Sequence, residues 1–459
     1  MADPPHKVPP ATLSSILEEE KQEFARPASR ESRLALAVRA LRHRNFQLFF
    51  AGQLISLIGT WMQTVAQSWL VYRMTGSAFL LGAVGFAGQI PVFIMAPVGG
   101  IVADRHNRQR VVIGTQTVSM ILAAILAALT LSHQVQVWQI LVLAAGLGAV
   151  NAFDIPARQS FLIDMVGRED LMNAIALNSS MFNGARIIGP AVAGILVASI
   201  GEGWCFFANS VSYIAVIAGL LMMRIKRPAR LATEGSPLEN IVEGFAYARN
   251  TGPIRAILLL LGLVSFVGMP YAVLMPVFAD QILHGGARGL GILMGATGVG
   301  ALLGAASLAA RVGVRGLGKL IGFCAGGFGL SLILFSFSKI FWLSTLLLLP
   351  VGFFMMVQMA SSNTLIQSMV PDQLRGRILA VYSMMFMGMA PFGALSAGAV
   401  ANRLGAPWTV ALGGAACVAA AIFFWGQLPS FRREARELVL AQGMTAGTPA
   451  QGANSGGIS

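Results

Sequence analysis

The amino-acid sequence predicts an all-α integral membrane protein, with twelve transmembrane helices arranged as two six-helix bundles. Of the 459 residues, 56% are hydrophobic and only 11% are charged, which is too little charge to cover a soluble core. Apolar runs of about 20 residues recur along the chain, and only helices that satisfy their own backbone hydrogen bonds can cross a bilayer in such runs. A long basic loop separates the sixth run from the seventh.

Each apolar run predicts one span, bounded by polar or turn-forming residues. The predicted spans cover residues 47–72, 77–102, 111–131, 137–158, 172–199, 204–223, 254–279, 288–310, 318–338, 341–368, 378–402 and 408–427. The predicted domains are an N-terminal tail (1–45), a first bundle (46–223), a central loop (224–253), a second bundle (254–428) and a low-complexity, disordered C-terminal tail (429–459).

The formal net charge of +13 is explained by the topology of the chain, because the basic residues gather on one side of the membrane. Most of the 32 lysines and arginines lie in the two tails and in the even-numbered loops, whereas Arg73, Arg288, Lys339 and Arg403 fall on the opposite side. This bias predicts a multi-pass protein of the plasma membrane with both tails in the cytoplasm, touching anionic lipid headgroups. Nucleic acid is not needed to explain the charge. Residues 32–46 predict a basic amphipathic helix on the inner leaflet.

Span one carries a polar stripe. Five of its members, within an arc of about 100° at 100° per residue, are Gln53, Ser56, Thr60, Gln63 and Gln67. Because lipid does not accommodate such groups, the stripe must face inward. It lines a substrate passage or forms a hydrogen-bonded seam between helices, and the number of glutamines favours the passage. Lesser candidates for the passage, from spans ten and eleven, are Gln358, Asn363 and Tyr382.

The loop after span two, GGIVADRHNRQR, contains the most specific motif. Its spaced residues are Gly100, Asp104, Arg105, Arg108 and Arg110. The pattern resembles the signature between the second and third helices of the major facilitator superfamily, in which glycine permits close helix approach at a short turn. The resemblance implies a latch between Asp104 and the start of span eleven, near Arg375 and Arg377, that closes when the cytoplasmic side is shut. The alternative is a solvated ion pair.

Spans four and five resemble one branch of that superfamily. The blocks NAFDIPARQSFLIDMV (151–166) and LMNAIALNSSMFNGARIIGPAVAG (171–194) look like the branch with enterobactin, macrolide and multidrug exporters. The glycines and proline that resemble the exporter signature of span five are Gly184, Gly189, Pro190 and Gly194. The resemblance implies proton-driven efflux of a siderophore, macrolide or other amphiphile, without specifying which.

Arg186 lies inside span five, where an arginine costs about 3 kcal/mol on insertion scales. It is about 21 Å from the inner boundary at 1.5 Å per residue, too far to reach either surface comfortably. We therefore expect it to face a hydrated passage, lined in part by Asn178 and Asn183. The alternative is a structural arginine that bonds helix carbonyls and pins spans four and five together.

Proton coupling has one candidate group. Asp154 lies toward the inner end of span four, and Arg158 follows on the same helix face. Asp154 could carry a proton or could form a structural pair with Arg158. All five histidines lie in tails or loops, so the sequence predicts no intramembrane metal site, and it contains no HExxH or GxSxG motif. We therefore expect no enzyme activity and no cofactor, with the proton gradient as the energy source.

These patterns together favour a monomeric secondary transporter that exports a small amphiphilic molecule by alternating access. The central loop should contain a surface helix in LENIVEGFAYAR. An importer or a lipid flippase on the same scaffold shares every feature except the span-five signature. A receptor or scaffold without transport is less favoured, because no loop between helices is long enough for a soluble signalling domain.

Overall fold

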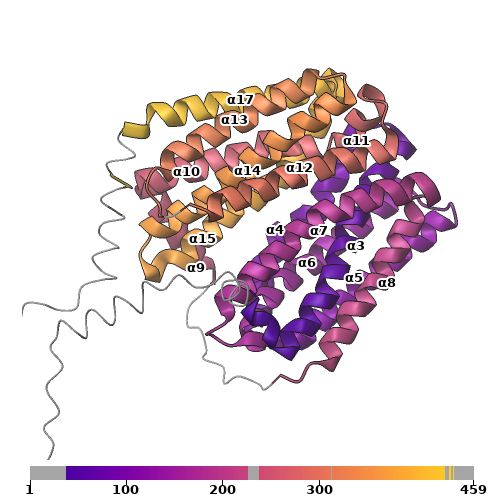
Figure 1. Ribbon diagram of the computed structural model, residues 1–459, viewed down its shortest axis with the longest axis horizontal. Coiled ribbons are helices and arrows are strands. Elements are labelled where there is room, and N and C mark those ends of the chain that lie inside the picture. The colour runs from indigo at the N-terminus through magenta and orange to yellow at the C-terminus, as the bar shows by residue number, and fades with distance from the viewer. Residues whose placement is uncertain (1–37, 226–236, 312, 430–433, 436–437, 439–459) are drawn as a thin grey trace, which may run out of the picture.

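The computed structural model describes residues 38–225, 237–311, 313–429, 434, 435 and 438. Within them, twelve helices are long and apolar enough to cross a membrane, which confirms the predicted all-α fold class. Figure 1 shows the first six from indigo to pink and the second six from pink to yellow. Of the predicted amphipathic helix at 32–46, residues 32–37 lie outside the described residues, and the rest forms a short 3-10 helix (Arg39–Arg42) and the start of the first spanning helix. Of the predicted disordered tail, the structure describes only residues 429, 434, 435 and 438, and the last three are helical.

The first six spans are continuous helices. They are α3 (Arg44–Thr75), α4 (Ala78–Arg105), α5 (Arg108–Leu131), α6 (Val137–Val166), α7 (Leu171–Ile200) and α8 (Glu202–Met222). Helices α4, α6 and α7 contain prolines, but each continues through them. In a membrane bundle, neighbouring helices can satisfy the carbonyl that a proline leaves unpaired. Here α4 packs on α6, and α8 packs on both α3 and α5.

Two of the second six spans are interrupted. The continuous ones are α12 (Gly286–Ala309), α13 (Leu317–Phe337), α14 (Phe341–Met369) and α17 (Ala406–Gly426). Span seven, Gly252–Ile282, passes through α10 (Gly252–Leu263), η2 (Val264–Gly268), η3 (Met269–Ala272), α11 (Met275–Val277) and η4 (Phe278–Ile282). Span eleven consists of α15 (Asp372–Met387) and α16 (Met389–Leu404). Prolines at 270, 276 and 391 remove backbone donors at or near these breaks.

We call the end of the molecule where α3 begins and α17 ends the tail side, and the opposite end the far side. The bundles pack on one another through two helix pairs, α7 with α12 and α4 with α16. Helix α16 is the far-side half of span eleven, and its tail-side half, α15, makes no comparable contact with α4 in the described chain. The two bundles are therefore joined at the far side and separate toward the tail side.

Helix α9 (Pro237–Asn250) lies in the loop between the bundles, where the sequence predicts a surface helix. It packs against α15 of the second bundle. The backbone of Gly244 approaches that of Arg377, and Glu243 forms an ion pair with the Arg377 side chain. Arg375 pairs with Asp372 on its own helix at 2.6 Å. Both arginines near the predicted latch thus have partners within the second half of the chain.

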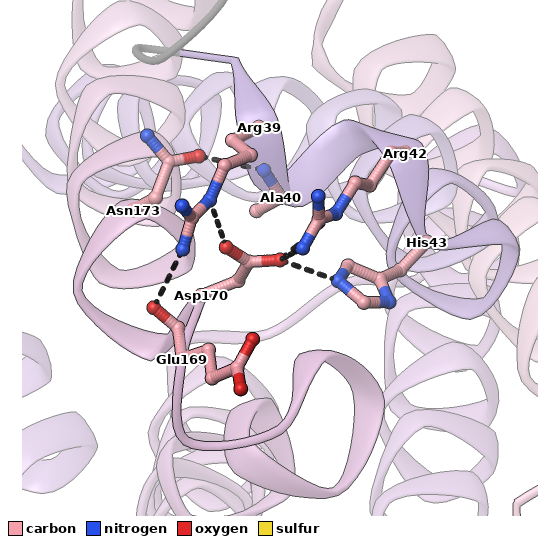
Figure 2. A network of polar contacts seen from close by, with 7 residues as sticks. All are labelled: Arg39, Ala40, Arg42, His43, Glu169, Asp170 and Asn173. Carbon is pink, nitrogen blue, oxygen red and sulfur yellow. Dashed lines mark hydrogen bonds and ion pairs between the residues drawn. The ribbon is translucent and has the colours of Figure 1, made fainter. Parts of the chain in front are cut away.

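A network around Asp170 fixes the start of the first bundle (Figure 2). Asp170, in the turn before α7, is only 1% exposed and forms ion pairs with Arg39, Arg42 and His43. Arg39 and Arg42 belong to η1 (Arg39–Arg42), a short helix preceding α3. The hydrogen bond from His43, with those from the two arginines, holds the pKa of Asp170 below its usual range. The chain before span one is thereby tied to the start of span five.

We expect Asp170→Asn to lower the melting temperature by a few degrees and to speed tryptic cleavage at Arg39 and Arg42. Because folding lowers the pKa of Asp170, its contribution is present above the ordinary aspartate pKa and is lost as the pH falls through the lowered value. The stability difference from wild type should therefore vanish at acidic pH. Glu169→Gln is the control, since Arg39 bonds the Glu169 backbone carbonyl. Equal effects of both variants would contradict the assignment.

Candidate functional site

The contact between α4 and α16 closes one side of the far half. A methyl group on Gly82 would overlap the carbonyl of Ala394, and one on Gly398 would lie 2.8 Å from the carbonyl of Ala78. Only glycine permits backbones to approach so closely. The contact extends to mid-depth, where the ring of Phe93 lies against Gly388 at the break in span eleven.

The contact between α7 and α12 closes the other side in the same manner. A methyl group on Gly291 would lie 2.6 Å from the carbonyl of Pro190, and one on Gly194 would lie 3.0 Å from the Cα of Gly291. This contact also ends at mid-depth, where a methyl group on Gly298 would lie 2.8 Å from the side chain of Ile187. Two glycine crossings, one on each side, thus close the far half.

A polar bridge joins the bundles at the far end. The Tyr72 hydroxyl, near the end of α3, donates a hydrogen bond to Asp280 in η4 at 3.0 Å. Tyr72 is 6% exposed, so the bond lies at the edge of the packed region. The neighbouring Arg73 pairs at 2.8 Å with Glu202, which belongs to the same bundle. Of these two contacts, only Tyr72–Asp280 must break when the far side opens.

Arg186 lies at the point where the bundles begin to separate. Its backbone faces Gly298 of α12, and its guanidinium lies over the ring of Trp61 on α3, with 5.8 Å from Cζ to the ring centroid. Tyr271, in the irregular part of span seven, is close enough to interact with it electrostatically. Arg186 therefore sits between α3, α7 and the second bundle. Asn183, one turn nearer the tail side, is half-buried and donates to the Ser179 carbonyl at 2.9 Å, and Asn178 is also half-buried.

The prediction that the polar stripe of span one lines a passage is wrong for Gln53 and Gln63. Their exposed fractions are 2% and 6%, and Gln63 accepts a hydrogen bond from Asn209 of α8 at 2.7 Å. Gln63 thus belongs to a hydrogen-bonded seam between α3 and α8, whereas Gln53 is buried with no hydrogen-bond partner for its amide oxygen among the described residues. Thr60 is half-buried and donates to a carbonyl of its own helix, and Gln67 is half-buried. The stripe alone could not separate the two interpretations, because both bury it away from lipid.

Two lesser candidates also pack inside a bundle. Gln358 is 2% exposed, and Tyr382 is 9% exposed and donates to the Met359 carbonyl at 2.9 Å. The prediction that they line a passage is therefore wrong in this conformation, since contacts within the second bundle bury both. Asn363 is half-buried and accepts from Gln367, one turn further along α14, at 3.1 Å.

The structure places the motif after span two at the tail-side turn from α4 to α5. Asp104, Arg105 and Arg110 are exposed, and Arg108 pairs with Asp164 of α6 at 3.1 Å. With α15 separated from α4, the predicted latch of Asp104 is not engaged here and stays a prediction. Gly100 faces open space, so its predicted role in close helix approach is wrong. The adjacent Gly99 has that role, because a methyl group there would overlap the Ala152 carbonyl of α6.

The glycines of the span-five signature also differ in how closely they approach neighbouring helices. Gly189 packs tightly, since a methyl group there would overlap Trp61 and lie 2.9 Å from the Ile58 carbonyl of α3. Gly194 and the carbonyl of Pro190 contact α12. A methyl group on Gly184, in contrast, would meet no other atom within 4 Å. The expectation of tight packing therefore fails at Gly184, which precedes the region where the bundles meet.

Asp154 is buried inside the first bundle. It is 3% exposed and accepts hydrogen bonds from Thr115 at 2.7 Å and from Gln116 at 2.9 Å, both on α5. Arg158 pairs with it at 3.3 Å from the next turn of α6 and is 21% exposed at its side chain. The carboxylate thus links two helices, with the arginine between it and the less buried region.

Three residues at the junction of the bundles belong to no motif that the sequence could have identified. Trp61, Tyr72 and Tyr271 stand in ordinary apolar runs, and only the fold brings them to the junction of the bundles. The close helix crossing, in contrast, could have been predicted from the spacing of glycines in span two. Gly82, Gly85 and Gly88 recur at helical spacing on α4, which is the small-residue pattern of a close helix crossing.

Two six-helix bundles, joined by glycine crossings at one side and separating around a half-buried arginine, are the arrangement of a multi-pass membrane transporter. The family described as transmembrane secretion effector matches residues 35–444, so the chain belongs to that family of the major facilitator superfamily. The family consists of transporters, not enzymes.

The curated relatives that this chain resembles are named as efflux pumps or as siderophore transporters. The staphyloferrin A transporter of Staphylococcus aureus is 26% identical over 380 residues, which covers 82% of this chain and 94% of the relative. The multidrug efflux pump Tap of Mycolicibacterium fortuitum is 26% identical, with 76% and 87% covered. The enterobactin exporter EntS of Shigella boydii is 26% identical, with 74% and 81% covered.

Solved structures show the same fold. The nucleoside transporter NupG superimposes with a TM-score of 0.64 at 15% identity, covering 84% of this chain and 98% of that one. A bacterial homologue of the iron transporter ferroportin, solved in an inward-facing state, gives 0.62 at 17% identity, covering 83% and 98%.

Proposed function

We propose that this protein exports a small amphiphilic molecule across the bacterial inner membrane by proton-coupled antiport. The tail side is the cytoplasmic side, as the distribution of lysine and arginine indicates. The cargo enters where the bundles separate and leaves after the far side opens. Drug-like, macrolide and siderophore molecules fit a pathway with apolar, amide and cationic groups, and the curated relatives support this range.

One observation carries the proposal. The far-half crossings at Gly82–Ala394 and Gly291–Pro190 depend on backbone contact between the two bundles, whereas α15 stands apart from α4 on the tail side. A transporter with one side closed and the other open needs a second state with the reverse arrangement. In that second state, the exposed Asp104 and the start of span eleven would form the contact that closes the tail side.

Asp154 is the proposed proton carrier. Protonation would remove its charge and release Arg158, and a change of this kind can bias the two bundle arrangements. The hydrogen bonds from Thr115 and Gln116 position the carboxylate for that exchange. The protein needs no cofactor in this scheme, and it acts as a monomer with lipid around both bundles.

Inside-out vesicles from a pump-deficient bacterial strain test the proposal. They would be supplied with a panel of fluorescent anionic, neutral and cationic amphiphiles, with and without a protonophore. We expect accumulation of at least one amphiphile, its collapse with the protonophore, and its loss in Asp104→Asn at unchanged membrane levels. Accumulation only in right-side-out vesicles would indicate an importer. Transbilayer movement of labelled phospholipid without accumulation of any amphiphile would indicate a flippase.

A further inference from the structure

Arg186 lies at the depth where the two bundles begin to separate. It lies in the middle of α7, and its carbonyl would lie 3.3 Å from a methyl group on Gly298, the last close crossing of α7 with α12. Beyond this point, toward the tail side, the next glycine of α7, Gly184, faces open space. The backbone of Arg186 therefore lies at the tail-side end of the contact between α7 and α12.

The surroundings of Arg186 form a shaped aromatic site. Gly189 lies one turn further along α7 on the same face, and its missing side chain leaves the space that Trp61 occupies. The Arg186 guanidinium lies over the indole at cation–π distance, and the rings of Trp61 and Phe182 meet edge to face, with 5.7 Å between their centroids. Stacking on an aromatic ring uses one face of a guanidinium and leaves its N–H groups free to donate at the edges.

No carboxylate of the described residues forms an ion pair with Arg186. The acidic groups of the membrane-spanning region have other partners, with Asp154 held by Arg158, Glu202 by Arg73, and Asp280 by the Tyr72 hydroxyl. The guanidinium is half-buried and has no carboxylate partner among the described residues, so a ligand can supply the opposite charge.

We propose that Arg186 and Trp61 form an anion-binding subsite, which holds a carboxylate or similar planar anionic group on an aromatic or apolar cargo. The fork of the guanidinium matches a carboxylate with two parallel hydrogen bonds, and the Trp61 and Phe182 rings contact the adjoining apolar portion. The inference rests on the proposed transport function and narrows its cargo to amphiphilic anions. It concerns binding alone, so direction and coupling do not enter its test.

The test compares two probes of nearly equal shape. Purified protein in nanodiscs would be equilibrated with radiolabelled 2-naphthoate or 2-naphthamide at pH 7.5, and bound probe measured by equilibrium dialysis. We expect the wild type to bind naphthoate at least about tenfold more tightly than naphthamide, since a charge-assisted pair is worth that much or more. Arg186→Gln should bind the two equally. Arg186→Lys should keep part of the charge preference, and Trp61→Leu should weaken both probes.

Arg288→Gln is the matched control, because it removes an exposed arginine at the far-side start of α12 and should leave both affinities unchanged. Melting temperatures of all variants establish that each is folded. Equal affinity for the two probes in the wild type, no naphthoate binding, or a charge preference that survives in Arg186→Gln would each overturn the subsite. Failure of the transport function would appear separately, as absence of energised accumulation in the vesicle panel.

Discussion

Replacing Gly291 with alanine should favour the far-open state and reduce transport by about fivefold or more. The added methyl group would lie 2.6 Å from the Pro190 carbonyl and 2.8 Å from the Cα of Gly194, both backbone atoms of the opposite bundle. Overpacking of this kind costs about 1–3 kcal/mol. Because only the far-closed state contains the contact, the cost shifts the balance of states toward far-open by a factor of about 5 to 150. Gly82→Ala should act in the same direction, through Ala394.

The measurement is the distance between spin labels on Ser132 and Lys339, which are exposed in far-side turns of different bundles. We expect a longer distance in Gly291→Ala than in the wild type. Gly184→Ala is the control on α7, since its methyl group would meet no other atom within 4 Å. Gly99→Ala should lower stability without changing the distance, because its clash with Ala152 lies within one bundle. An unchanged distance in Gly291→Ala would contradict the gating role.

Replacing Asp154 with asparagine should give the second large effect, on both stability and coupling. The substitution leaves Arg158 without its partner and replaces one acceptor oxygen with an amide donor beside Thr115 and Gln116. Breaking a buried ion pair from one side costs about 3–5 kcal/mol. We expect a clearly lower melting temperature in detergent and loss of uphill transport in proteoliposomes with an imposed proton gradient.

The double variant Asp154→Asn/Arg158→Gln separates the two roles of the pair. Removing both charges should restore much of the stability, since no buried charge is left unpaired. If Asp154 carries the proton, the double variant binds cargo and equilibrates it, yet remains unable to move it uphill. Recovery of uphill transport together with stability would show that Asp154 is only a structural link between α5 and α6.

The pattern of apolar residues was sufficient to predict the twelve spans, because the bilayer restricts the structure that each segment can adopt. A run of about 20 apolar residues has to be a helix in lipid, so the twelve spans follow from local sequence. The breaks in spans seven and eleven were not predicted, although Pro270, Pro276 and Pro391 signal them. Proline in a membrane helix is compatible with a continuous helix, as α4 and α7 show, and neighbours decide the outcome.

Composition and spacing by themselves determined the membrane class, the twelve spans, the surface helix of the central loop and the presence of an arginine within span five. Only the tertiary structure decided which way each polar group turns. Gln53 proved to be buried and Gln63 to bond to α8, while Arg186 proved to lie over Trp61 where the bundles begin to separate. A helix shows the same polar stripe to a partner helix as to a passage, since both exclude lipid. The identity of that partner depends on contacts between segments more than a hundred residues apart.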